Sequence, residues 1–87
     1  SLSINEEKVS LGIIFPNPVI DELTIKLKTS SYNDDRFILI DLNGREVLNI
    51  PLNYQDTRVS LTDISSGMYI YELMVNGKGE IGKIIKE

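Results

Sequence analysis

Apolar residues recur at every second position in several short runs of this chain, and this spacing constrains the fold more than any other feature. In ELTIKLK, residues 22–28, Leu23, Ile25 and Leu27 alternate with polar residues. Such alternation is the pattern of a β-strand that buries one face and leaves the other in water. A period of 3.6 residues never persists long enough to predict a helix, so the chain is expected to be all-β.

Seven short strands can be placed along the 87 residues. RFILIDL at 36–42 is the most continuously apolar and is expected to be a central strand covered on both faces. Pro51 makes EVLNIPL an edge strand, because proline cannot donate to a central ladder. A spacing of about 8 to 12 residues between strands is typical of a β-sandwich. The predicted strands are the run before FPNP, then ELTIKLK, RFILIDL, EVLNIPL, TRVSL, GMYIYELMV and EIGKIIKE.

FPNP at 15–18 places two prolines around one asparagine, directly after the apolar run LGII. Proline has no backbone N–H, and it biases the residue before it toward extended conformations. The segment is therefore expected to end a strand at a sheet edge. Both X-Pro bonds are expected to be trans, since only about 5% of such bonds in folded proteins are cis.

Two Asn-Gly pairs, at 43–44 and 76–77, separate neighbouring apolar runs. Because Asn-Gly tolerates φ > 0 at both central turn positions, each pair predicts a tight β-hairpin. DLNG at 41–44 also has the beginning of a calcium loop, but an EF-hand needs a glutamate where Leu52 stands. The adjacent Asp34 and Asp35 are expected to stay solvated in a loop.

Composition excludes several classes of function. The chain contains no His and no Cys, which excludes histidine-based triads, thiol nucleophiles and ordinary zinc sites. Nine basic against thirteen acidic residues give a net charge of −4 without a visible basic patch, so no nucleic-acid partner is predicted. No apolar run approaches the roughly 20 residues of a membrane-spanning helix. We predict no metal, no cofactor and no enzymatic activity.

Four tyrosines could form a platform for sugar rings. Tyr69 and Tyr71 share a strand face with an apolar stripe, so they are expected to pack in the core with each hydroxyl at its margin. Tyr32 and Tyr54 fall in predicted loops and remain candidate surface contacts.

The last run, GKIIKE, places Ile84 and Ile85 on opposite faces between Lys83 and Lys86. It is open to two interpretations. Lysines can protect a closing edge strand from pairing with other chains. Alternatively, an edge strand beside a chain end can be recognised by strand addition.

Taken in order, FPNP, DLNGREV, LTDISSGMYIYEL with NGK, and the terminal KIIK resemble the C-terminal sorting domain of proteins exported by the type IX secretion system of Bacteroidetes. The resemblance runs from about Val9 to the end. Phe15 stands where relatives often have Tyr, ISSG lacks the proline of Leu-Pro-Ser-Gly, and Glu87 follows the last lysine. The motif positions are Phe15, Pro16, Asn17, Pro18, Asp41, Asn43, Gly44, Arg45, Leu61, Gly67, Tyr69 and Gly77.

This resemblance implies a single domain over 1–87, core about 9–87, folded as an Ig-like β-sandwich of about seven antiparallel strands. It implies a non-catalytic address on an N-terminal cargo domain, which is in transit through the periplasm to the cell surface or the extracellular space. The outer-membrane translocon would recognise the domain, and a sortase would cleave upstream of it. The absence of an initial Met is likewise expected of a piece of a longer protein.

Individual roles follow from the same resemblance together with the local chemistry. Phe15 is expected to plug one end of the sandwich, and Gly67 to give backbone freedom before the strand of Tyr69. Lys83, Ile84, Ile85 and Lys86 are the expected recognition residues, because their backbone edge and basic side chains are predicted to be presented near the chain end. A weak dimer through an edge strand is also possible on this reading.

Two alternatives come from other classes of protein. The first is an accessory module of a large extracellular enzyme, of the carbohydrate-binding or fibronectin-like type, which fold class does not separate from a sorting domain. The second is an enzyme, which the lack of any recognisable nucleophile with its base disfavours.

Overall fold

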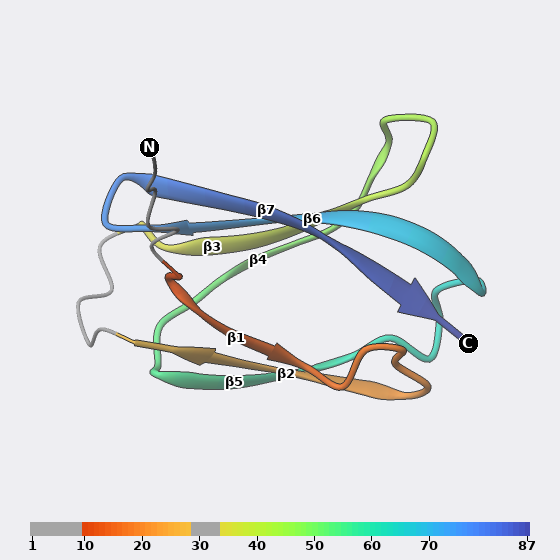
Figure 1. Ribbon diagram of the computed structural model, residues 1–87, viewed down its shortest axis with the longest axis horizontal. Coiled ribbons are helices and arrows are strands. Elements are labelled where there is room, and N and C mark those ends of the chain that lie inside the picture. Colours follow the sequence, from red (N-terminus) through yellow and green to blue (C-terminus); the bar gives the residue numbers. More distant parts are fainter. Residues whose placement is uncertain (1–9, 29–33) are drawn as a thin grey trace, which may run out of the picture.

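Two antiparallel sheets pack face to face in the computed structural model, which describes residues 10–28 and 34–87 (Figure 1). The three-stranded sheet has the order β1–β2–β5, with β1 at Gly12–Phe15, β2 at Glu22–Leu27 and β5 at Asp56–Ser60. The four-stranded sheet has the order β4–β3–β6–β7, with β3 at Arg36–Ile40, β4 at Glu46–Pro51, β6 at Gly67–Val75 and β7 at Lys78–Lys86.

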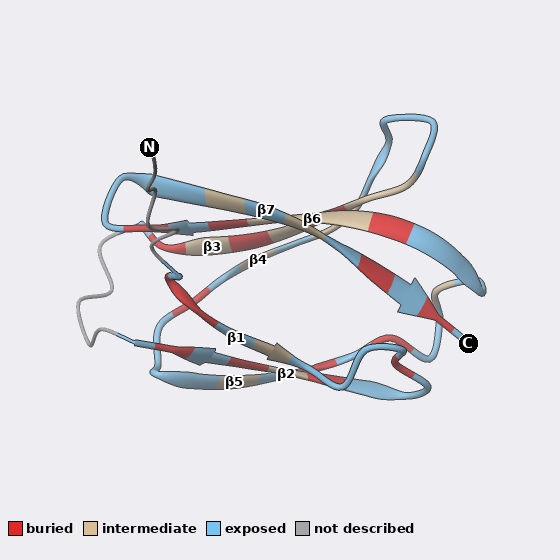
Figure 2. Cartoon of the chain, viewed as in Figure 1, coloured by how far each residue is buried: buried red, intermediate tan, exposed pale blue. Residues whose placement is uncertain are grey.

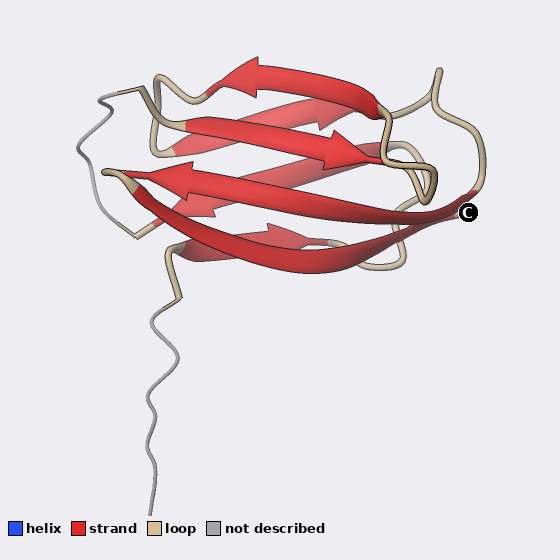
Figure 3. Ribbon diagram, turned by 90° about the horizontal axis from the view of Figure 1, so that it is seen from above, coloured by secondary structure: helices blue, strands red, loops and turns tan. Residues whose placement is uncertain are grey.

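This arrangement confirms the predicted all-β, Ig-like sandwich of seven strands. Figure 3 shows strands and loops throughout the described part of the chain. None of the described residues forms a helix of the length and apolarity needed to cross a membrane.

The core lies between the two sheets and follows the two-residue alternation of the sequence (Figure 2). Leu23, Ile25 and Leu27 of β2 point inward, as predicted, and the polar residues between them point out. Burying one such aliphatic side chain contributes about 1.5–3 kcal/mol relative to leaving it in water. The four-stranded sheet supplies the opposite wall of the core with Phe37, Leu39, Leu48, Ile50, Tyr69, Tyr71, Leu73, Val75 and Ile84.

The strand β3 is central, as predicted, but it is fully covered on one face only. Phe37 and Leu39 are buried, whereas Ile38 and Ile40 are half-buried on the outer face of the sheet. No described element covers that outer face, so the expectation of burial on both sides was wrong.

The two Asn-Gly pairs adopt different turns. Asn76 and Gly77 both have positive φ, 53° and 77°, which confirms the predicted two-residue hairpin between β6 and β7. In the β3–β4 connection only Gly44 has positive φ, at 85°, and the loop runs from residue 41 to residue 45. The predicted hairpin is confirmed, because β3 pairs antiparallel with β4, but its connection is longer than the expected two-residue turn.

Asp35 departs from the expected solvated pair, because its residue is only 2% exposed while Asp34 is exposed. Its Oδ1 accepts the backbone N–H of Asn76 at 3.0 Å, and its carbonyl accepts the N–H of Leu52 at 2.9 Å. Asp35 thus ties the start of β3 to the β6–β7 turn and to the end of β4. No group of three or more potential metal ligands occurs in 10–28 and 34–87.

Candidate functional site

The segment after β1 crosses to the four-stranded sheet and lies along the outer edge of β7. We call residues 16–20 the strap. The side chain of Asn17 donates from Nδ2 to the carbonyl of Lys83 at 2.9 Å and accepts the N–H of Ile85 on Oδ1 at 3.1 Å. The N–H of Val19 donates to the carbonyl of Ile85 at 2.8 Å, and the carbonyl of Val19 accepts the N–H of Glu87 at 2.8 Å.

These bonds close the backbone edge that the sequence predicted to be open. From Lys83 to Glu87, alternate residues direct N–H and C=O away from β6, and the strap pairs the carbonyl of Lys83, both backbone groups of Ile85 and the N–H of Glu87. The side-chain amide of Asn17 takes the place of one peptide group of an added strand. The edge of β7 at 83–87 is therefore not available for strand addition while the strap is in place.

The strap also corrects two expectations about FPNP. The Phe15–Pro16 and Asn17–Pro18 bonds are both cis, where trans was expected. The preference for trans at an X-Pro bond is only about 0.5–1 kcal/mol, so the surrounding fold can select either isomer. The predicted strand end at Phe15 is confirmed.

Phe15 does not plug the sandwich, because its residue is 41% exposed. Alternation along β1 puts Gly12 and Ile14 toward the core and therefore puts Phe15 on the outer face of its sheet. Val19 of the strap, with no exposed surface, fills the interior at this end.

The predicted recognition residues divide between the two faces of β7. Lys83 and Ile85 point outward and are exposed, Ile85 at 43%. Ile84 is completely buried in the core, and Lys86 is buried with its Nζ donating to the carbonyl of Glu87 at 3.3 Å. Only Lys83 and Ile85 can therefore meet a partner through their side chains without unfolding the strand.

The turn at DLNGR is organised by the carboxylate of Asp41. Its Oδ1 accepts the N–H groups of Asn43 and Arg45, each at 2.9 Å, and its carbonyl accepts the N–H of Gly44 at 3.0 Å. Asp at the first position and Gly at the fourth are the preferences of a type I turn. The pKa of Asp41 lies below its ordinary value. The N–H of Arg45 lowers it most, and the N–H of Asn43 and the Arg45 guanidinium lower it further.

Tyr69 packs in the core, as predicted, and its hydroxyl donates to the carbonyl of Ser65 at 2.6 Å. A tyrosine bonded to the backbone a few residues upstream is the tyrosine corner of Ig-like sandwiches. It fixes the connection from β5 to β6. Gly67, the first residue of β6, has φ of 149°, which confirms its predicted need for backbone freedom.

Tyr71 also lies on the inner face and stacks on Phe37 with ring centroids 6.0 Å apart. Its ring covers Gly82 on β7, where an added Cβ would approach the ring to 2.5 Å. Burial, followed by the charge of Glu80, raises the pKa of Tyr71. Of the two loop tyrosines, Tyr54 is 70% exposed, and Tyr32 lies outside the described residues.

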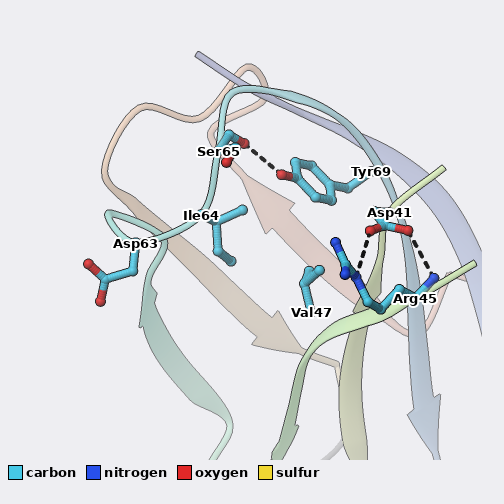
Figure 4. A pocket seen from close by; sticks show the side chains of 7 residues that line it. All are labelled: Asp41, Arg45, Val47, Asp63, Ile64, Ser65 and Tyr69. Carbon is cyan, nitrogen blue, oxygen red and sulfur yellow. Dashed lines mark hydrogen bonds and ion pairs between the residues drawn. The ribbon is translucent and has the colours of Figure 1, made fainter. Parts of the chain in front are cut away.

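A pocket of about 360 Å³ opens beside Tyr69 and is lined by Asp41, Arg45, Val47, Asp63, Ile64, Ser65 and Tyr69 (Figure 4). The Arg45 guanidinium is held by Asp41, with Nε to Oδ2 at 3.3 Å, while Asp63 points away from it. The hydroxyl of Tyr69 is already bonded to Ser65. The polar groups of this pocket thus serve mainly the turn and the tyrosine corner.

Several sequence motifs that are far apart along the chain meet at one end of the sandwich. The strap bonds the end of β7, Gly67 is paired with Lys86, and Tyr69 is paired with Ile84. The pocket brings the DLNGR turn to the same tyrosine.

The two remaining motif positions lie elsewhere or serve the core. Leu61, which is fully buried, bonds from its N–H to the carbonyl of Asp21 at 2.7 Å. Gly77 lies in the hairpin at the opposite end (Figure 1).

Sequence reasoning missed the accessible apolar residues beside Lys83 and Ile85. Met68 and Ile70 lie directly across from Ile85 and Lys83 on β6. A signal for them was present, because GMYIYELMV is apolar on its second face as well as on the core face. Formation of the core does not require apolar residues on that second face.

Comparison with known proteins shows the family of this chain. The family model of the secretion system C-terminal sorting domain matches residues 13–87, which is most of the chain. A search of curated proteins found no match. The chain therefore belongs to the secretion system C-terminal sorting domain family, the sorting signals of type IX secretion.

Proposed function

We propose that the outer-membrane translocon reads this sorting signal through the outward face of β7 at Lys83 and Ile85, and that a sortase then cleaves the precursor upstream of the domain. The family match supports a signal that works with the type IX machinery on an attached cargo destined for secretion through the outer membrane. In our proposal the domain travels with its cargo through the periplasm and is removed after export.

One observation carries the choice of residues. Lys83 and Ile85 are exposed on a strand that is fixed on its other sides, by Ile84 in the core, by β6 and by the strap. A side chain presented from a rigid backbone loses little conformational freedom when it binds, so more of its contact energy appears as affinity. Recognition of this kind needs no catalytic group in the domain.

The first experiment asks whether the domain is sufficient for export. Residues 1–87 are fused behind a periplasm-targeted fluorescent protein, and the fusion is expressed in a strain with the type IX system and in one without the translocon. We expect the reporter on the surface or in the medium of the first strain only. Retention of the reporter in the first strain, or equal release from both, would contradict the proposed function.

The second experiment tests the residues. The variants Lys83→Glu and Ile85→Asp are expected to reduce export, while Lys78→Glu, an equal charge change at the other end of β7, is expected to leave export unchanged. Truncation after Gly82 is a poorer test, because it also removes Ile84 from the core and the partners of the strap. Wild-type export by both Lys83→Glu and Ile85→Asp would remove these residues from the proposal.

A further inference from the structure

The outer face of the four-stranded sheet is largely apolar on β3, β6 and β7, where its charged residues are Arg36, Glu72 and Lys83. Four of its large apolar side chains are exposed, from 37% at Met74 to 70% at Ile81, and three isoleucines beside them are half-buried. Soluble domains scatter single apolar residues over their surfaces, whereas contiguous apolar patches mark interaction sites. This patch, which we call the outer apolar face, consists of Ile38 and Ile40 on β3, Met68, Ile70 and Met74 on β6, and Ile81 and Ile85 on β7.

The strand register makes these residues neighbours. Across β6 and β7, Met68 is paired with Ile85 and Ile70 with Lys83. Ile70 is also paired with Ile40 on β3. Directly opposed residues point to the same side of a sheet with Cβ atoms about 4.5–5.5 Å apart. The patch therefore spans three strands and lies beside Lys83, and Glu72, which is paired with Ile38 and Ile81, lies within it.

The outer face of the three-stranded sheet is different. Along β2 and β5 it carries Lys26, Asp56 and Arg58, with Lys26 Nζ and Asp56 Oδ2 3.6 Å apart. Arg58 is paired there with Thr24. Apolar residues on this face are confined to the edge strand β1.

We propose that the outer apolar face is the docking surface for a receptor protein of the secretion machinery, whose own surface is apolar and places a carboxylate against Lys83. This inference rests on the proposed function and extends the contact from two residues to the whole face. Interfaces of this type bury an apolar centre and pair the charges within it.

The charge of Lys83 identifies the chemistry of the partner. Its ammonium has no ion-pair partner among residues 10–28 and 34–87, and its cross-strand neighbour is Ile70. A wholly apolar partner would strip water from this ammonium without compensation, which is costly. A carboxylate in the partner compensates that loss. The outward-facing Glu72 of β6 and Glu46 of β4 disfavour an anionic lipid surface as the occupant.

The test uses the export assay with variants outside the terminal motif. Met68→Asp and Ile81→Asp place a charge in the proposed contact, and each is expected to lower export about tenfold or more, the effect of losing one important contact residue. Thr24→Asp and Arg58→Asp place the same charge on the other outer face and are expected to export normally. Met68→Ser and Ile81→Ser repeat the test without a new charge, and thermal unfolding of each purified variant checks that it folds.

Substitutions at Lys83 test the carboxylate. Export is expected to stay close to wild type in Lys83→Arg, to fall in Lys83→Met and to fall further in Lys83→Glu. Equal export by Lys83→Met and Lys83→Glu would contradict a facing carboxylate.

The outcomes separate this inference from the proposed function. If the wild-type fusion is not exported, the proposed function fails. If it is exported in a translocon-dependent way and folded Met68 and Ile81 variants are exported equally well, only the docking face is overturned.

Other occupants of the face give their own results with the purified domain. A dimer in sedimentation velocity that Ile81→Asp abolishes and Thr24→Asp preserves would assign the face to a second copy and overturn the receptor. Flotation with phosphatidylglycerol vesicles that Ile81→Asp abolishes and Thr24→Asp preserves would assign the face to a membrane and overturn the receptor. A monomer that does not float supports the proposal.

Discussion

The outer faces of the two sheets differ in chemistry, although the strands of both sheets follow the same two-residue alternation. In the three-stranded sheet, the outward positions of β2 and β5 are charged or polar, and burial of the inner positions is enough to form the sheet. In the four-stranded sheet the outward positions of β3, β6 and β7 are largely apolar, although the core on the other side is already complete. Burial in the core does not account for those outward residues, whereas the docking face that we propose does.

The contrast between the buried and the outward side is greatest at two adjacent, chemically identical residues. Ile84 is fully buried and Ile85 is 43% exposed. Truncating a buried isoleucine to alanine costs about 2–5 kcal/mol through lost burial and the cavity left behind. Ile84→Ala is therefore expected to lower the free energy of unfolding by that amount, and Ile85→Ala by less than about 1 kcal/mol. Urea unfolding measures both, and equal losses would contradict the division of β7 into two faces.

The strap is bonded to the edge of β7 beside its outward residues, and we expect it to hold that end of the strand in place. Asn17→Ala removes two hydrogen bonds to β7, and we expect a loss of about 1–3 kcal/mol in the free energy of unfolding. Asn49→Ala is a matched control, because Asn49 also makes two side-chain hydrogen bonds, to Arg36 and Glu46, on the exposed edge strand β4. Urea unfolding is expected to show the larger loss for Asn17→Ala. A larger loss of unfolding free energy for Asn49→Ala would contradict a role of the strap in stabilising β7.

The polar outer face is expected to tolerate change. The Lys26–Asp56 pair is solvent-exposed, and such pairs contribute about 0–1 kcal/mol. Lys26→Ala should therefore leave the free energy of unfolding nearly unchanged, with any effect diminishing as salt is added. A large, salt-independent loss in thermal unfolding would show that this face has a structural role of its own.

The smallest expected effect is a pH dependence at the DLNGR turn. The pKa of Asp41 is lower in the folded domain than its ordinary value of 3.8, which we take for the unfolded chain. Its carboxylate therefore stabilises the fold fully at neutral pH, and this contribution is lost as the pH falls below 3.8 through the folded pKa. Asp41→Asn is expected to show a weaker loss of stability in that acid range. Identical acid unfolding curves for the variant and wild type would contradict this role.

Local patterns in the sequence predicted the elements, because alternation, proline positions and Asn-Gly pairs act over a few residues. They placed Pro51 at an edge, Leu23 and Ile25 inside, and the hairpin at Asn76. The DLNGR turn was misjudged because the carboxylate of Asp41, rather than the Asn-Gly pair alone, decides its shape.

Two further errors concern contacts between distant parts of the chain. Asn17 and Lys83 are 66 positions apart, and Asp35 and Asn76 are 41 apart. No local pattern reports that the strap closes the edge of β7 or that a loop aspartate is buried. Likewise, the exposure of Phe15 follows from which face of β1 meets the core.

The most direct test of the docking face is site-specific photocrosslinking during export. A photoreactive amino acid replaces Ile81 on the outer apolar face or Lys26 on the polar outer face of the fusion, in cells that export the reporter. We predict that position 81 forms a crosslink to an outer-membrane component of the type IX machinery and that position 26 does not. Crosslinks to that component from position 26 and none from position 81, with both fusions exported, would contradict the account.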